Sequence, residues 1–208
     1  MGKLTDRLLI GVTSNYLRLV HMTSKIVFTG YTDARDAGEK YLFGFWHGDS
    51  YSFFPLLDGR GDVIITTVNR RGDYIDGLGK AFGLVSARLP DDPDSAGAFS
   101  GIRFLLNAAK DQHIATSMDG PLGPYHIPKR FVLTIAYLAK KRIVPISLTV
   151  KRKIVLTRRW DNYVIPLPFS HITFDFHEPV TVHKDKLEEA SDRIIEEMNE
   201  AYNAKTRV

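Results

Sequence analysis

Three short segments carry residue types that could do chemistry. The first, residues 45–50, reads Phe-Trp-His-Gly-Asp-Ser and joins an apolar run to a helical pattern. A histidine at the carboxyl end of a strand lies where open α/β sheets bind ligands, and imidazole can act as a general base near neutral pH. Gly48 would let a substrate approach the backbone, and Asp49 would orient the imidazole or cap the helix. His47 is therefore a candidate base, with a purely structural role as the alternative.

The second segment, residues 117–124, has two glycines and two prolines within five residues. This composition is typical of a rigid loop, here one that follows a strand. Asp119 would cap a tight turn, or the loop would handle an anion, because the chain that follows is basic. The third segment, residues 160–169, places two prolines beside aromatic residues and indicates a rigid apolar wall.

The charge of the chain is unevenly distributed. Residues 125–160 contain ten Lys or Arg and no acid, although the whole chain of 208 residues carries only +4. A basic region attracts phosphorylated small molecules, anionic lipid headgroups or nucleic acid, with a solvated face as the alternative. Several of these cations flank apolar runs and no base-stacking platform is evident, so we expect no nucleic-acid partner.

Composition excludes several chemistries. The chain has no cysteine, which removes thiolate catalysis, Cys-ligated zinc and iron–sulfur clusters. No pair of histidines has a zinc-site spacing supported by a third ligand, so we expect no metal. No run reaches the roughly 20 apolar residues of a membrane span, and the start lacks a signal-peptide cleavage site. We expect a cytoplasmic protein.

Short apolar runs alternate with helical patterns along the chain. This alternation predicts an α/β fold with a central mixed, largely parallel sheet flanked by helices. Strands are predicted at residues 25–29, 41–46, 62–68, 113–117, 142–150, 153–157, 172–176 and 180–182, and helices at 49–57, 74–82, 95–110, 129–141 and 184–204.

The start of the chain forms a separate unit in this prediction. Residues 4–22 read as an amphipathic helix, so we divide the chain into residues 1–24 and an α/β domain at residues 25–208. The helix would either pack on its own domain or lie on a bilayer, where Lys3, Arg7, Arg18 and Lys25 would meet lipid phosphates. In the second case the protein is peripheral on an anionic inner-membrane surface.

The three segments, in this order and with the Ile-Val-Pro-Ile strand at residues 143–146, resemble the lysophospholipid (glycerolipid) acyltransferase superfamily. Within it they resemble a bacterial branch, a domain of unknown function with tryptophan-His-Gly and Asp-Gly-Pro-x-Gly-Pro blocks. The resemblance covers residues 41–182. It implies transfer of a fatty acyl group from a thioester of coenzyme A or acyl carrier protein to a hydroxyl of a lysophospholipid or related lipid. A lipid-binding protein of the same fold without catalysis is the alternative.

The resemblance also implies roles for individual residues. His47 would deprotonate the acceptor hydroxyl, the loop at residues 119–124 would help to bind the acceptor, and no bound cofactor is required. His47 and Asp119 are the catalytic candidates. The substrate-binding candidates are Trp46, Gly48, Asp49, Arg88, Gly120, Pro121, Gly123, Pro124, Lys129, Val144 and Pro145.

Two positions differ from the superfamily pattern. The acid that commonly follows the histidine by five residues is here Ser52. Asp49 is poorly placed to orient His47, because residues two apart on a helix point in different directions. A distant acid such as Asp119, or a backbone carbonyl, would have to orient the ring. The second difference is that acids at residues 91, 92 and 94 follow Arg88, so this arginine would serve the acceptor or balance these acids.

Overall fold

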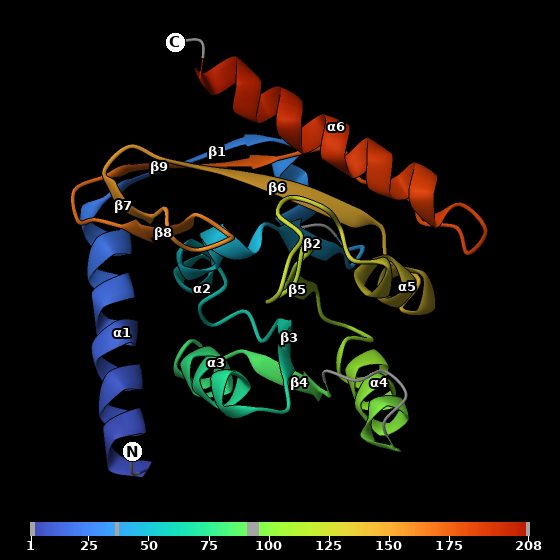
Figure 1. Ribbon diagram of the computed structural model, residues 1–208, viewed down its shortest axis with the longest axis horizontal. Coiled ribbons are helices and arrows are strands. Elements are labelled where there is room, and N and C mark those ends of the chain that lie inside the picture. The colour runs from blue at the N-terminus through green and yellow to red at the C-terminus, as the bar shows by residue number, and fades with distance from the viewer. Residues whose placement is uncertain (1–2, 36–37, 91–95, 207–208) are drawn as a thin grey trace.

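A seven-stranded sheet forms the centre of the computed structural model, which describes residues 3–35, 38–90 and 96–206. The strands of this sheet are β1 (Lys25–Gly30), β2 (Leu42–Phe45), β3 (Val63–Thr67), β4 (Val85–Leu89), β5 (Ile114–Ser117), β6 (Ile143–Val150) and β9 (His171–Phe176). They lie in the order β1-β9-β6-β2-β5-β3-β4 (Figure 1). Among these neighbours only β6 and β9 are antiparallel, so the predicted mixed, largely parallel sheet is confirmed.

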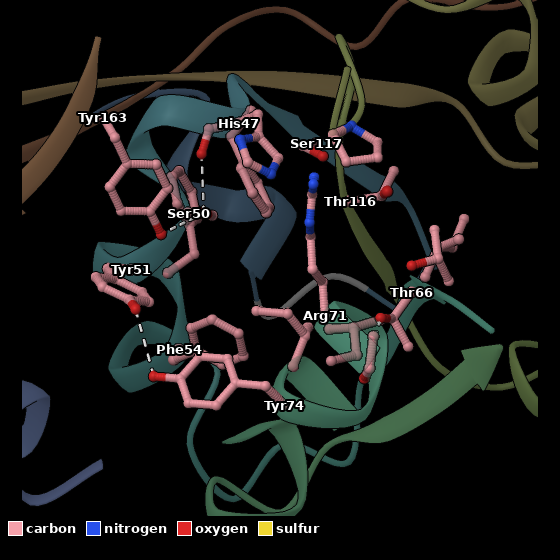
Figure 2. Close-up of a pocket in the computed structure, with 18 of the residues that line it drawn as sticks. His47, Ser50, Tyr51, Phe54, Thr66, Arg71, Tyr74, Thr116, Ser117 and Tyr163 are labelled. Carbon is pink, nitrogen blue, oxygen red and sulfur yellow. Dashed lines mark hydrogen bonds between the residues drawn. The ribbon is translucent and has the colours of Figure 1, made fainter. Parts of the chain in front are cut away.

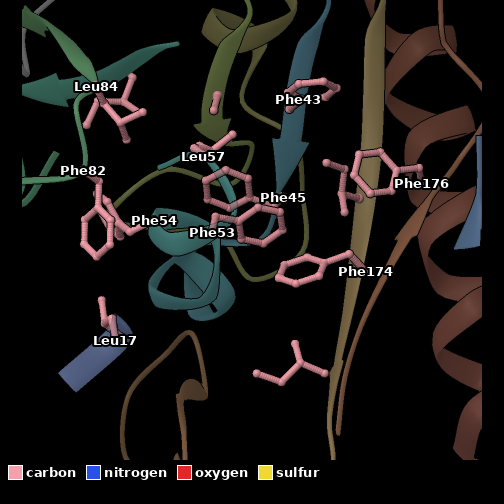
Figure 3. Packing of buried hydrophobic residues seen from close by; sticks show 14 of the residues in the cluster. Leu17, Phe43, Phe45, Phe53, Phe54, Leu57, Phe82, Leu84, Phe174 and Phe176 are labelled. Atoms are coloured by element: carbon pink, nitrogen blue, oxygen red, sulfur yellow. The ribbon is translucent and has the colours of Figure 1, made fainter. Parts of the chain in front are cut away.

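Helices cover both faces of the sheet (Figure 1). They are α1 (Lys3–Thr23), α2 (Phe53–Leu56), α3 (Arg70–Ala81), α4 (Ala96–Ala108), α5 (Arg130–Leu138), α6 (Leu187–Thr206) and the 3-10 helices η1 (Thr32–Arg35) and η2 (His47–Ser52). Strand β2 shows the two-sided burial typical of a central parallel strand. Phe43 and Phe45 pack in a cluster with residues of α1, α2 and α3 (Figure 3), whereas Leu42 packs in a second cluster with residues of α4, α5 and α6.

Some predicted elements differ from the structure. The predicted strand at 180–182 is only an isolated bridge between Val180 and Ile143. The helix predicted from residue 74 starts at Arg70, because the Asn69 side chain accepts a hydrogen bond from the Gly72 N–H at 3.0 Å and caps the helix. Strand β4 and strand β8 (Tyr163–Pro166) were not predicted. Strand β8 pairs with β7 (Lys153–Leu156) in a separate antiparallel hairpin.

Helix α1 has one buried and one exposed apolar face. Leu17 and Val20 are buried in the same cluster as the phenylalanines of β2. Leu8, Val12 and Met22 lie on the opposite side and are exposed. Across the described ranges, no helix combines the length and apolarity needed to cross a membrane.

Candidate active site

The sheet topology brings the first two sequence segments together. Strands β2 and β5 are parallel neighbours, with Phe45 paired to Ser117, and their carboxyl ends meet at one edge of the sheet. His47 follows β2 and Asp119 follows β5. The backbone N–H of His47 donates a hydrogen bond to Asp119 Oδ1 at 2.7 Å. The Asp119 loop therefore anchors the main chain at the candidate base.

The carboxyl group of Asp119 is deeply buried. Its second oxygen, Oδ2, has no hydrogen-bond partner within the described part of the chain. Burial raises the pKa of Asp119 to about 6 and that of the neighbouring Asp49 to about 7. Both carboxyl groups therefore change charge near neutral pH.

The imidazole of His47 contacts an acid from the third segment. Its Nδ1 lies 2.8 Å from Oδ2 of Asp161, whose side chain is 0% exposed, whereas the His47 side chain is 22% exposed. Arg159 donates to both oxygens of this carboxylate, from Nε to Oδ1 at 2.9 Å and from Nη2 to Oδ2 at 2.8 Å. Burial opposes ionisation of Asp161, but the hydrogen bonds from Arg159 and His47 outweigh it and lower the pKa of that carboxyl.

The protonation of the imidazole follows from this pairing. An ionised carboxylate only accepts hydrogen bonds, so Nδ1 of the neutral ring carries the proton and donates it to Asp161. Nε2 is then left with a free lone pair. This is the tautomer that a general base requires.

Close backbone contacts hold the three segments together. Gly48 lies so near the backbone carbonyl of Asp161 that a β-carbon would collide with it. Gly123, at φ 69°, packs on the indole of Trp160, and a β-carbon there would lie 2.8 Å from Cε3. The Trp160 indole also stacks on the ring of His47, at 5.7 Å between centroids. The two glycines therefore permit a packing that side chains would prevent.

A cavity of about 1150 Å³ extends from His47 into the domain. Its deeper wall is apolar and includes Phe54, Leu57, Ile64 and Leu84. Figure 2 shows His47 at one end of the cavity and Tyr74, from α3, near the other. The volume exceeds that of most small-molecule pockets, and the wall suits a hydrocarbon chain.

Polar groups gather near the histidine end. Arg71 extends from α3 toward Ser117 and lines the cavity (Figure 2). Arg158 and Arg159, in the turn of the β7–β8 hairpin, also line it. Neither Arg71 nor Arg158 forms an ion pair within the described residues. Such guanidinium groups can bind an anionic substrate group.

Arg88 contacts Asp73 and Thr67, which line this cavity, but its own side chain does not line it. Its guanidinium lies 2.6 Å from Asp73 Oδ1 and donates to the backbone carbonyl of Thr67 at 3.0 Å. Arg88 thus ties β4 to the chain that leads into α3, and it is not among the residues that line the cavity. The acids at 91, 92 and 94 lie outside the described residues.

Of the remaining sequence candidates, some lie at the cavity or in its loop, and the others are buried or contact the chain elsewhere. Pro121 lines the cavity, and Gly120 and Pro124 lie in the same loop. Trp46 is buried and stacks on His126 at 4.6 Å, and the backbone N–H of Lys129 donates to Met118 O at 2.7 Å. Val144 and Pro145 are buried within β6, and neither lines the cavity.

Sequence reasoning missed Asp161 as the partner of the imidazole. The residue was visible within the third segment, beside Trp160, but that segment indicated only an apolar wall. Its position 114 residues from His47 gives no local signal.

Comparisons with known proteins agree with this geometry at the level of the fold. No protein-family model matches the chain. An uncharacterized protein of Rickettsia prowazekii (strain Madrid E) is 28% identical over 179 residues, which cover 83% of this chain and 80% of that protein. The 1-acyl-sn-glycerophosphate (LPA) acyltransferase PlsC from Thermotoga maritima superposes with a TM-score of 0.53 over 93% of this chain and 81% of that one, at 14% identity. The chain has the fold of an acyltransferase. At this level of identity the likeness concerns the fold alone.

Proposed function

We propose that the protein moves a fatty acyl group from an acyl thioester to a hydroxyl of a lysophospholipid or related lipid acceptor, with His47 as the general base. The observation that carries the proposal is the position of His47, whose imidazole lies at the polar end of a large cavity with an apolar interior. The acyltransferase fold supports the reaction class. The tryptophan-His-Gly and Asp-Gly-Pro-x-Gly-Pro blocks support membership of the bacterial branch that they resemble.

The reaction needs one proton acceptor and two positioned substrates. Nε2 of His47 takes the proton of the acceptor hydroxyl as its oxygen attacks the thioester carbonyl. The C–S bond then breaks, and the thiolate leaves with the proton from the imidazolium. The apolar wall holds the hydrocarbon chain, and confinement of both substrates supplies several kcal/mol of barrier lowering. A thioester is already activated, so this chemistry requires no metal.

The test is an acyl-transfer assay with the full chain. A long-chain acyl thioester of coenzyme A or of acyl carrier protein is offered together with lysophospholipids, and the acylated product is measured by mass spectrometry. We expect product with at least one donor and acceptor pair. A protein that carries lipid in native mass spectrometry but turns over no thioester would instead be the lipid-binding alternative.

Arg71 is proposed to bind the anionic group of the acceptor. Arg71→Ala should raise KM for a phosphate-bearing acceptor by roughly 10- to 100-fold, because a charged hydrogen bond contributes about 1.5–3 kcal/mol, while kcat changes less. Arg130→Ala on the exposed start of α5 is the matched control and should leave KM unchanged. Equal KM values for the Arg71 variant and the wild type would contradict the assignment.

The exposed face of α1 supports a peripheral position on an anionic membrane surface. Leu8, Val12, Leu19 and Met22 share this face, and Met22 is 83% exposed. The backbone N–H of Phe169, another exposed apolar residue, donates to Thr23 Oγ1 at 3.3 Å and extends the patch beyond the helix. Arg7 and Lys25 are exposed basic residues at this helix, whereas Arg18 pairs with Asp58. An apolar helix face with such basic residues suits the interface of anionic bilayers.

Vesicle sedimentation tests this position. Val12→Asp with Met22→Asp should reduce sedimentation with vesicles that contain phosphatidylglycerol, because two charges would enter the apolar interface. Deletion of the helix is unsuitable, since Leu17 and Val20 are buried in the core. Phe99→Asp on α4 is the control for added charge. Unchanged sedimentation of the double variant would exclude this face as the anchor.

A further inference from the structure

We infer that Asp161, clamped by Arg159, is the positioning residue that holds the imidazole of His47 in its base-competent tautomer. The inference rests on the proposed function, because it assigns the group that makes His47 a base. It concerns an acid 114 residues away along the chain, from the loop that leads into β8.

The geometry separates Asp161 from the other acids near His47. Asp119 accepts its 2.7 Å hydrogen bond from the backbone N–H of His47, so it holds the main chain and not the ring. Asp49 follows two residues later in η2, and its side chain makes no hydrogen bond to the ring. Asp161 contacts the ring itself at 2.8 Å. Orientation of the imidazole therefore depends on the third segment.

Arg159 gives the carboxylate a fixed direction. Its two hydrogen bonds, of 2.9 and 2.8 Å, engage both oxygens of Asp161, and such a fork also sets the plane of the carboxylate. The guanidinium stacks over the ring of Tyr163 at 4.9 Å, which restrains the arginine in turn. A fully buried carboxylate without this partner would be costly, so the Arg159 pair keeps Asp161 charged beside His47.

The local backbone is built to admit this contact. Gly48, the residue after the histidine, leaves the space that the backbone carbonyl of Asp161 occupies. The hydroxyl of Ser50 donates to the His47 carbonyl at 2.8 Å and lies 2.9 Å from the Tyr163 hydroxyl. These contacts join η2 to β8 on both sides of the pair. The imidazole and the carboxylate are thus held by their two backbones as well as by their own hydrogen bond.

Asp161 has a role both before and after His47 accepts the hydroxyl proton. While His47 is neutral, the carboxylate accepts the Nδ1–H and leaves Nε2 free to take the hydroxyl proton. After that transfer, the imidazolium lies 2.8 Å from a negative charge that stabilises it. Arg159 disfavours protonation of Asp161, so the proton stays on the ring until the leaving thiolate takes it.

The first readout is the tautomer, which needs no activity. Histidine ring ¹⁵N resonances of the full-length protein are recorded, and those of His47 are assigned with His47→Gln. We expect Nδ1–H in the wild type and a shift toward Nε2–H in Asp161→Asn, since the new amide can donate to Nδ1. Asp58→Asn removes an aspartate paired with Arg18 at the surface and should leave the His47 resonances unchanged. A His47 tautomer that is the same in Asp161→Asn and the wild type overturns the inference.

The second readout is the kinetic profile. For Asp161→Asn we expect kcat to fall roughly 10²–10⁴-fold with little change in KM, because the wrong tautomer cannot accept the proton. Asp161→Glu should recover part of kcat. Wild-type kcat in Asp161→Asn would also overturn the inference.

Two further experiments cover a variant that does not fold and a wild type that shows no acyl transfer. If Asp161→Asn does not fold by circular dichroism, Arg159→Gln replaces it. That change leaves the carboxylate in place, and kcat should fall about 10-fold with KM retained, whereas an unchanged kcat rejects the clamp. If the wild type transfers no acyl group, the proposed function fails, and the ¹⁵N tautomer still decides whether Asp161 positions the ring.

Discussion

His47→Ala should lower kcat for acyl transfer by roughly 10²–10⁴-fold, the range that a positioned general base contributes. The methyl group cannot accept the hydroxyl proton, so attack on the thioester carbonyl would require an alkoxide formed without assistance. KM should change little, because the apolar wall of the cavity and Arg71 remain in place. A steady-state assay at saturating donor and acceptor measures both constants.

The fold should tolerate this change. The His47 side chain is partly exposed, and its removal leaves Asp161 paired with Arg159. Thermal unfolding should therefore show a folded protein, which separates lost catalysis from lost structure. His183→Ala, at an exposed position after the last strand, is the matched control and should retain full activity. Full activity of His47→Ala would show that His47 is not the base.

Phe174→Ala should destabilise the protein by about 3–5 kcal/mol, the range for deletion of a buried aromatic ring. Phe174 on β9 is 0% exposed and stacks on Phe28 of β1 at 5.8 Å between centroids. It also meets Phe53, at the start of α2, edge to face at 5.3 Å. The cavity left by the ring would lie between the sheet and the short helix that follows the candidate base (Figure 3).

Urea denaturation measures this loss as a lower midpoint with an unchanged slope. Phe99→Ala is the matched control, because Phe99 on α4 is 78% exposed, and its free energy of unfolding should stay within about 0.5 kcal/mol of the wild type. A Phe174 variant as stable as this control would contradict the packing described for the core.

Local pattern in the sequence was enough to predict the sheet and to place His47 and Asp119 each at the end of a strand. Apolar runs with helical patterns between them predict parallel strands. A helix between two strands carries the chain back across the sheet, so the second strand starts at the same end as the first. His47 and Asp119 each follow such a run, so the rule that ligands bind at the carboxyl ends of strands places both at one edge. Strands β4 and β8 escaped prediction because Val-Ser-Ala-Arg-Leu mixes polar with apolar residues and Tyr-Val-Ile-Pro ends in proline.

Tertiary structure alone decided which charged groups meet. The resemblance indicated Arg88 as an arginine that binds the acceptor, but Arg88 pairs with Asp73, whereas Arg71 lines the cavity. Asp161 reaches the imidazole only because the β7–β8 hairpin folds back onto η2, a contact that depends on close backbone approach at Gly48. Hydrophobic periodicity indicates which residues share a face of one helix or strand. The contact of His47 with Asp161, 114 residues away, depends instead on how distant elements pack together. The amino-acid sequence therefore determined the elements and the edge at which they present polar groups, and the packing of the hairpin determined the partner of the histidine.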